Sequence, residues 1–255
     1  MPLQTGIIYG PVRSRRLGAS LGVNLLPTHY KLCSFNCLYC QYGWTPKPTL
    51  TINDHARELP RGAEVSSALE ERLQGAVKRK EKIDCITFSG NGEPTLHPEL
   101  ADIVAAVRAL RDRYLPKAKL AILSNSSTVG RAEVREALAA LDLRLMKFDA
   151  GTEDIIRRLN GVPAPFYIGE VVAGLKALKE VILQSMFVQG RVANTDPDSL
   201  EYWLEKVREV RPTLVQVYTL HRPPAEKRLW KVNLPTLQWI AGQVRWRAGV
   251  PAEVY

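Results

Sequence analysis

"IDCITFSGNGEPTLHPELADIVAAVRALRDRYLPKAKLAILSNSS" spans residues 83–127 and contains the pattern that decides the fold. Residues 83–89 form a nearly continuous β-rich run, as in a strand that is buried on both faces. Apolar side chains then recur at helical spacing over residues 99–115, and a second strand-like run leads into a polar loop at 120–127. A strand, a helix and a strand in this order predict two parallel strands joined by a right-handed crossover.

The same alternation extends along most of the chain. Strand-like runs occupy residues 20–26, 83–89, 120–127, 143–150, 182–190 and 214–220. Helical patterns cover residues 64–80, 99–115, 131–141, 166–179, 197–210 and 234–248. About six such units are too few for a closed eightfold barrel. We therefore predict an α/β fold, an open partial (βα)6 barrel with parallel strands, in one domain over residues 1–255.

The two ends of the chain lie outside this repeat. Residues 1–19 are expected to form an N-terminal extension, and residues 251–255 are expected to add one more short strand. Polar loops follow each predicted strand, among them "SGNGEPTLHP" and "SNSST". Because the carboxyl ends of parallel strands meet at one edge, we expect the functional site at that edge.

Composition narrows the class of protein. With 45% apolar residues, the chain can bury a core without disulfides. The first residues lack the pattern of a signal peptide, and no window of 18 apolar residues occurs. The expected location is therefore cytoplasmic, with no membrane partner, where clustered cysteines indicate metal or redox chemistry. A net charge of +9 favours anionic partners.

Three of the four cysteines lie within "CSFNCLYC", as Cys33, Cys37 and Cys40. A structural zinc site closes four ligands, and His29 would be an atypical fourth one here. Three thiolates on one loop instead suit three corners of a [4Fe-4S] cluster whose fourth iron stays open for a ligand. Cys85 lies within a predicted strand and is expected to be a buried apolar thiol. With only that cysteine left, we predict no second cluster.

The C-x3-C-x2-C spacing, with the aromatic Tyr39 before the last cysteine, resembles the signature of the radical S-adenosylmethionine (radical SAM) superfamily. "GPVRSRRLGASLGVNLLP" and "YCQYG" resemble one branch of it, the iron–sulfur oxidoreductases similar to tRNA wyosine-base synthases. The resemblance implies the same partial barrel and two cofactors, a [4Fe-4S] cluster and S-adenosylmethionine. It also implies the activity: the reduced cluster cleaves S-adenosylmethionine to a 5′-deoxyadenosyl radical, which abstracts hydrogen from a substrate.

The resemblance also implies a set of cofactor-binding residues. "GNGEP" is similar to the family's Gly-Gly-Glu segment, but here Asn91 separates the two glycines. Glycine lets the backbone approach a ligand closely, and a glutamate offers a carboxylate to the methionyl ammonium. The expected cofactor contacts are Tyr39, Gly92, Glu93, Pro94, Ser124 and Asn125. One or more of Lys147, Asp149, Gln184 and Ser185 is expected to face the ribose or the carboxylate.

The substrate is expected to be anionic. Arg13, Arg15 and Arg16 precede the first predicted strand, whereas His221 and Arg222 follow the sixth, just before two prolines. If those strands are the two edges of the sheet, both segments border the mouth of the barrel. A guanidinium on a stiff loop suits bidentate binding of phosphate or carboxylate, which makes Arg222 the candidate substrate anchor.

Two classes of function remain open from the sequence. An enzyme of this kind would take a tRNA base, a nucleotide-like metabolite or a peptide, and would need a low-potential electron donor such as ferredoxin or flavodoxin. The alternative is a non-catalytic iron–sulfur protein that transfers electrons or binds a partner. Four tryptophans, residues 203, 230, 239 and 246, are expected to be mostly core or helix-packing residues, and Trp44 is expected to shield the cluster.

Overall fold

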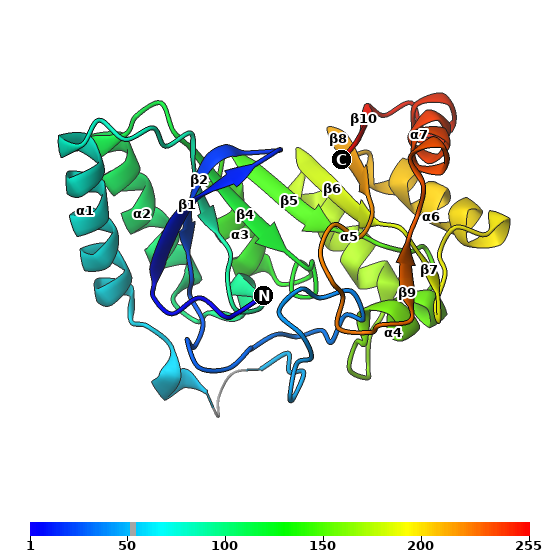
Figure 1. The fold of residues 1–255 in the computed structure, drawn as a ribbon, viewed down its shortest axis with the longest axis horizontal. Helices are drawn as coiled ribbons and strands as arrows, with labels where there is room; N and C mark the ends of the chain where they lie inside the picture. Colours follow the sequence, from blue (N-terminus) through cyan, green and yellow to red (C-terminus); the bar gives the residue numbers. More distant parts are fainter. Residues whose placement is uncertain (52–54) are drawn as a thin grey trace.

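The computed structural model describes residues 1–51 and 55–255. Within them, an eight-stranded sheet has the order β1-β2-β3-β4-β5-β6-β8-β10 and does not close (Figure 1). Its strands are β1 (Ile8–Ser14), β2 (Gly18–Val23), β3 (Cys85–Phe88), β4 (Lys119–Ser124), β5 (Leu143–Lys147), β6 (Val181–Met186), β8 (Leu214–Tyr218) and β10 (Ala252–Val254). β1 pairs antiparallel with β2, and every other pairing within this sheet is parallel. The predicted open α/β barrel is confirmed.

Helices cover the outer face of this curved sheet (Figure 1). They are α1 (Gly62–Lys78), α2 (Leu100–Tyr114), α3 (Ala132–Ala139), α4 (Glu153–Asn160), α5 (Ile168–Leu178), α6 (Pro197–Val210) and α7 (Leu234–Gln243), which continues into the π-helical turn η3 (Val244–Ala248). Two 3-10 turns, η1 (Ala56–Glu58) and η2 (Pro94–Leu96), and a separate two-stranded antiparallel sheet of β7 (Val188–Gly190) with β9 (Leu229–Lys231) complete the fold.

Alternate residues of each strand point to opposite faces of the sheet. In β3, Ile86 and Phe88 pack among the helices in the main core. Cys85 points the other way and packs with Ala121 and Leu145 inside the barrel. It is 1% exposed, as expected for a buried apolar thiol. The interior is therefore filled by small and apolar side chains below the strand ends, which leaves the carboxyl edge for a pocket.

Two strands and one α-helix were not predicted. β1 lies in the N-terminal segment, and its glycine, proline and arginine interrupt the apolar pattern of a strand. The helix α4 has four charged residues among its eight, so it reads as part of a polar loop. The strand β9 has three residues. The sheet edges are consequently β1 and β10, so the prediction that the strands now labelled β2 and β8 form the edges is wrong.

The tryptophans divide into one core residue and several surface residues. Trp203 is 1% exposed, whereas Trp230, Trp239 and Trp246 are 62%, 54% and 80% exposed. The expectation that these tryptophans are mostly core or helix-packing residues is confirmed for Trp203, whereas the other three are largely exposed. Trp44 is 47% exposed and does not line the pocket described below, so the structure gives it no shielding role.

Trp203 is expected to be the more costly of two matched truncations. Its indole stacks edge-on against Phe187 at 5.0 Å and donates a hydrogen bond of 3.1 Å to the carbonyl of Phe148. Trp203→Ala should lower the free energy of unfolding by about 3–5 kcal/mol, because it leaves a cavity in the core. Trp246→Ala should change it by less than about 0.5 kcal/mol. Urea denaturation measures both, and equal effects would contradict this account of the core.

Candidate functional site

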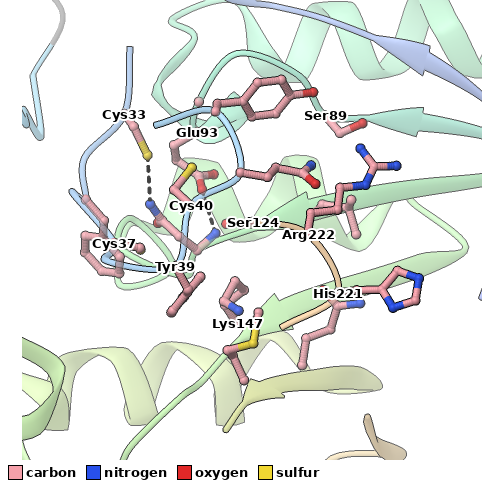
Figure 2. Close-up of a pocket in the computed structure, with 18 of the residues that line it drawn as sticks. Cys33, Cys37, Tyr39, Cys40, Ser89, Glu93, Ser124, Lys147, His221 and Arg222 are labelled. Carbon is pink, nitrogen blue, oxygen red and sulfur yellow. Dashed lines mark hydrogen bonds between the residues drawn. The ribbon is translucent and has the colours of Figure 1, made fainter. Parts of the chain in front are cut away.

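A pocket of about 410 Å3 lies at the carboxyl edge of the sheet. Its walls come from the loop after β2, which carries the three cysteines, and from the ends of β3, β4, β5, β6 and β8. Figure 2 shows Cys33, Cys40 and Glu93 together at one end of this pocket and His221 and Arg222 at the other. The structure therefore brings most of the predicted site residues to one place, at the predicted edge.

The cysteine loop is held by backbone hydrogen bonds to the end of α4. The amide of Asn36 donates to the carbonyl of Asn160 at 2.9 Å, and the amide of Leu38 donates to the carbonyl of Leu159 at 2.9 Å. Gly161 then ends the helix with φ +56°, where a Cβ would lie 2.6 Å from the carbonyl oxygen of Asn36. Free carbonyls at a helix end need donors, and this loop supplies them.

Cys33, Cys37 and Cys40 are free thiols that all line the pocket. Burial, with Cys37 nearby, raises the pKa of Cys33 to about 12, and burial, with Cys40 nearby, raises the pKa of Cys37 to about 11. A bound cation reverses this effect, because it stabilises thiolates. Across the described residues, no three cysteine, histidine or acidic side chains converge on a single ion. That is compatible with a [4Fe-4S] cluster, in which each thiolate binds a different iron.

Two asparagine amides donate towards the sulfurs. The Nδ2 atom of Asn125 lies 3.6 Å from Sγ of Cys33, and Nδ2 of Asn160 lies 3.5 Å from Sγ of Cys37. Hydrogen bonds to the sulfurs are one of the means by which proteins set a cluster's reduction potential. Asn125 was predicted as a site residue, but Asn160 was not. It ends the unpredicted helix α4, and nothing in its local sequence marks it.

Glu93 is a buried carboxylate that forms no ion pair with the described residues. It is 2% exposed and accepts hydrogen bonds from the amide of Asn125 at 2.6 Å and from the amide and hydroxyl of Thr95 at 3.1 Å and 2.6 Å. Burial raises its pKa, and these hydrogen bonds oppose the rise. No lysine, arginine or histidine among the described residues forms an ion pair with it. A carboxylate in this state suits an ammonium group such as that of S-adenosylmethionine.

The position before Glu93 requires glycine for a steric reason. Gly92 has φ +150°, and a Cβ there would overlap the carbonyl of Leu32, which accepts from the amide of Glu93 at 3.2 Å. The inserted Asn91 is fully buried, and its Nδ2 donates to the carbonyls of Pro27 and Gln4 at 2.8 Å and 2.9 Å. The asparagine that departs from the family pattern therefore anchors the N-terminal segment to this loop.

The remaining predicted cofactor residues divide between the pocket and its surroundings. Tyr39, Ser124, Asn125, Lys147 and Gln184 line the pocket. Pro94 begins the turn η2 and Ser185 donates to the carbonyl of Phe148, so both lie behind the wall. Asp149 accepts from the hydroxyl of Tyr39 and lies 3.2 Å from Nζ of Lys147, so it supports pocket residues from outside.

The basic segments meet at the pocket although the predicted edges were wrong. Arg15, Arg16, His221 and Arg222 all line it, whereas Arg13 does not. Arg222 is exposed, and its guanidinium lies against the thioether of Met1. His29, the alternative zinc ligand, lies elsewhere, 68% exposed and 3.1 Å from Glu58.

The family model of the radical SAM superfamily matches residues 28–190. The chain belongs to this superfamily. A UPF0026 protein of Methanocaldococcus jannaschii is 35% identical over 87% of this chain and 65% of its own length. A UPF0026 protein of Synechocystis is 30% identical over 87% of this chain and 77% of its own length. This radical SAM chain thus spans roughly two thirds to three quarters of these relatives.

Solved structures agree on the fold. A radical SAM methyltransferase from Sphaerobacter thermophilus has a TM-score of 0.67 at 17% identity and covers 92% of this chain and 65% of its own. TYW1 with a lysine-pyruvate adduct has a TM-score of 0.59 at 14% identity, with coverage of 89% and 73%. The cofactors predicted from the sequence, a [4Fe-4S] cluster and S-adenosylmethionine, are those of this superfamily. None of the described helices is long and apolar enough to span a membrane.

Replacement of single cysteines tests the cluster loop. Reconstituted protein should hold about 4 irons per chain. Changing Cys33, Cys37 or Cys40 to alanine should abolish the brown chromophore, because each sulfur faces the pocket. Cys85→Ala should keep it, because that thiol lies inside the barrel. Iron analysis and visible absorption measure this. A stable cluster in Cys37→Ala, or about 8 irons per chain, would contradict the assignment.

Replacement of Glu93 tests the cofactor site. A charge-assisted hydrogen bond to the methionyl ammonium contributes about 1.5–3 kcal/mol. Glu93→Gln should therefore weaken binding of S-adenosylmethionine about tenfold or more while iron content is unchanged. Glu136→Gln, on the exposed surface of α3, is the matched control. Equilibrium dialysis measures the affinity, and equal affinities in both variants would show that Glu93 is not the ammonium partner.

Proposed function

We propose that the protein is a radical SAM enzyme that cleaves S-adenosylmethionine reductively and abstracts hydrogen from an anionic substrate in the pocket. The observation that carries this is the convergence of three free thiols and the buried, uncompensated Glu93 on that pocket. Cys33, Cys37 and Cys40 would hold the cluster. When bound, the two cofactors supply an electron and a 5′-deoxyadenosyl radical.

The chain's own residues would bind, orient and exclude water. Glu93 would hold the methionyl ammonium, and Gly92 would let the backbone lie close to it. Asn125 would link the two loops, since its amide donates to Glu93 and its side chain to Ser34 at 2.8 Å. Tyr39 and Ser124 would complete the wall around the cofactor.

A non-catalytic iron–sulfur electron carrier is the alternative. Such a protein needs a cluster near the surface, but it does not need a pocket or a buried anion beside the cluster. The volume of the pocket and the state of Glu93 favour the enzyme. The substrate class remains a tRNA base, a nucleotide-like metabolite or a peptide, and the electron donor would be a ferredoxin or flavodoxin.

A cleavage assay separates the two functions. Anaerobically reconstituted protein, reduced with dithionite and given S-adenosylmethionine, should form 5′-deoxyadenosine and methionine in equal amounts. Chromatography with mass detection measures both products. Protein with a complete cluster that neither binds nor cleaves S-adenosylmethionine would support the electron carrier and refute the enzyme.

A further inference from the structure

The turn between β1 and β2 is built by its own side chains. The Oγ atom of Ser14 accepts the amides of Arg16 and Leu17 at 3.2 Å and 3.1 Å. Gly18 follows with φ +68°, a conformation that glycine adopts without strain. Asp84 accepts the amide of Ala19 at 2.8 Å, which joins the turn to the segment before β3. The turn is thus a defined structure.

Leu17 inserts this turn into the barrel. It packs against Cys85, Ala121 and Leu145, the apolar cluster inside the sheet. The hairpin therefore reaches across the open interior instead of staying at the edge of the sheet. Residues that precede a parallel strand normally lie at the amino edge of the sheet, away from the pocket. Because the turn reaches into the barrel, Arg15 and Arg16 nevertheless line the pocket.

Arg16 is held there without an acidic partner. Its guanidinium carbon lies 4.3 Å from the ring centre of Tyr218 and 4.7 Å from that of Tyr255. Its Nε atom is buried and has no hydrogen-bond partner among residues 1–51 and 55–255. In the described part of the chain, no carboxylate lies within 4.0 Å of it. Burial lowers the pKa of Arg16, and the tyrosines oppose that shift.

Other arginines of the protein form ion pairs of the kind that Arg16 lacks among the described residues. Arg111 pairs with Asp142 at 2.8 Å, and Arg144 pairs with Glu180 at 3.1 Å. Lys147, which also reaches Tyr218, has Asp149 beside it at 3.2 Å. A desolvated charge without a counterion costs free energy. Lys31 also lines the pocket and forms no ion pair within residues 1–51 and 55–255, but its ammonium donates a hydrogen bond of 2.9 Å to the carbonyl of Gly43. For Arg16 the same residues provide only the faces of two tyrosine rings.

We propose that Arg16 is the anchor of an anion subsite in the pocket, which binds a carboxylate or phosphate group of the substrate. This rests on the proposed function, because it concerns the same pocket. The planar guanidinium, held between two tyrosine rings, presents its N–H groups for bidentate binding. It stands on a packed turn, whereas Arg222 is exposed at the rim.

Inorganic phosphate is the probe for this subsite. Phosphate should raise the melting temperature of the reconstituted wild-type protein at constant ionic strength, because a ligand that binds only the folded state stabilises it. In Arg16→Gln, phosphate affinity should fall about tenfold or more, and the shift should disappear. Arg16→Lys should retain part of it. Arg108→Gln, an exposed arginine of α2, should behave as wild type. Isothermal titration gives the affinities.

The source of the anion is tested in the same variants. If Arg16 binds substrate, Arg16→Gln should keep its affinity for S-adenosylmethionine. A tenfold loss of that affinity would assign Arg16 to the cofactor's carboxylate and overturn the proposal. If Arg16→Gln binds phosphate as the wild-type protein does but melts at a lower temperature, the stacking of Arg16 on the tyrosine rings only stabilises the fold. That result would also overturn the proposal. Phosphate binding does not require turnover. A wild-type protein that is inactive but binds phosphate through Arg16 would therefore refute the proposed enzymatic activity and leave the anion subsite standing.

Discussion

The site depends on one constraint, the common direction of the parallel strands. Because β2, β3, β4, β5, β6 and β8 run the same way, their carboxyl ends meet at one edge. Loops that are far apart in sequence are therefore neighbours there. The cysteine loop after β2, the Glu93 loop after β3 and Asn125 after β4 form one continuous wall for this reason.

The pocket combines a buried carboxylate and a half-buried guanidinium that form no ion pair within the described residues. Glu93 lies at the end with the cysteines, and Arg16 comes from the hairpin turn that crosses the barrel. Folding alone does not favour such groups, since each would be more stable paired or in water. Ligands that bring the opposite charges would compensate both. Binding sites commonly contain groups that lower the free energy of unfolding of the protein without ligand.

The cysteine loop shows how a short helix can serve a site without touching ligand. The end of α4 offers free carbonyls to Asn36 and Leu38, and Gly161 leaves room for the loop to approach. The side chain of Asn160 then extends to Cys37, Tyr39 and Asp149. This one helix end thus positions the cysteine loop, donates a hydrogen bond towards a sulfur and supports the wall of the pocket.

The sequence by itself determined the features that are local in the chain. The spacing of Cys33, Cys37 and Cys40, the order of strands and helices, and Glu93 behind a glycine loop all follow from covalent neighbours and periodicity. Only the tertiary structure decided which groups meet across long separations. The insertion of Leu17, the isolation of Arg16, the donor from Asn160 and the exposure of Trp230, Trp239 and Trp246 depend on packing between distant segments. No local pattern encodes such packing, because the partners lie far apart along the chain.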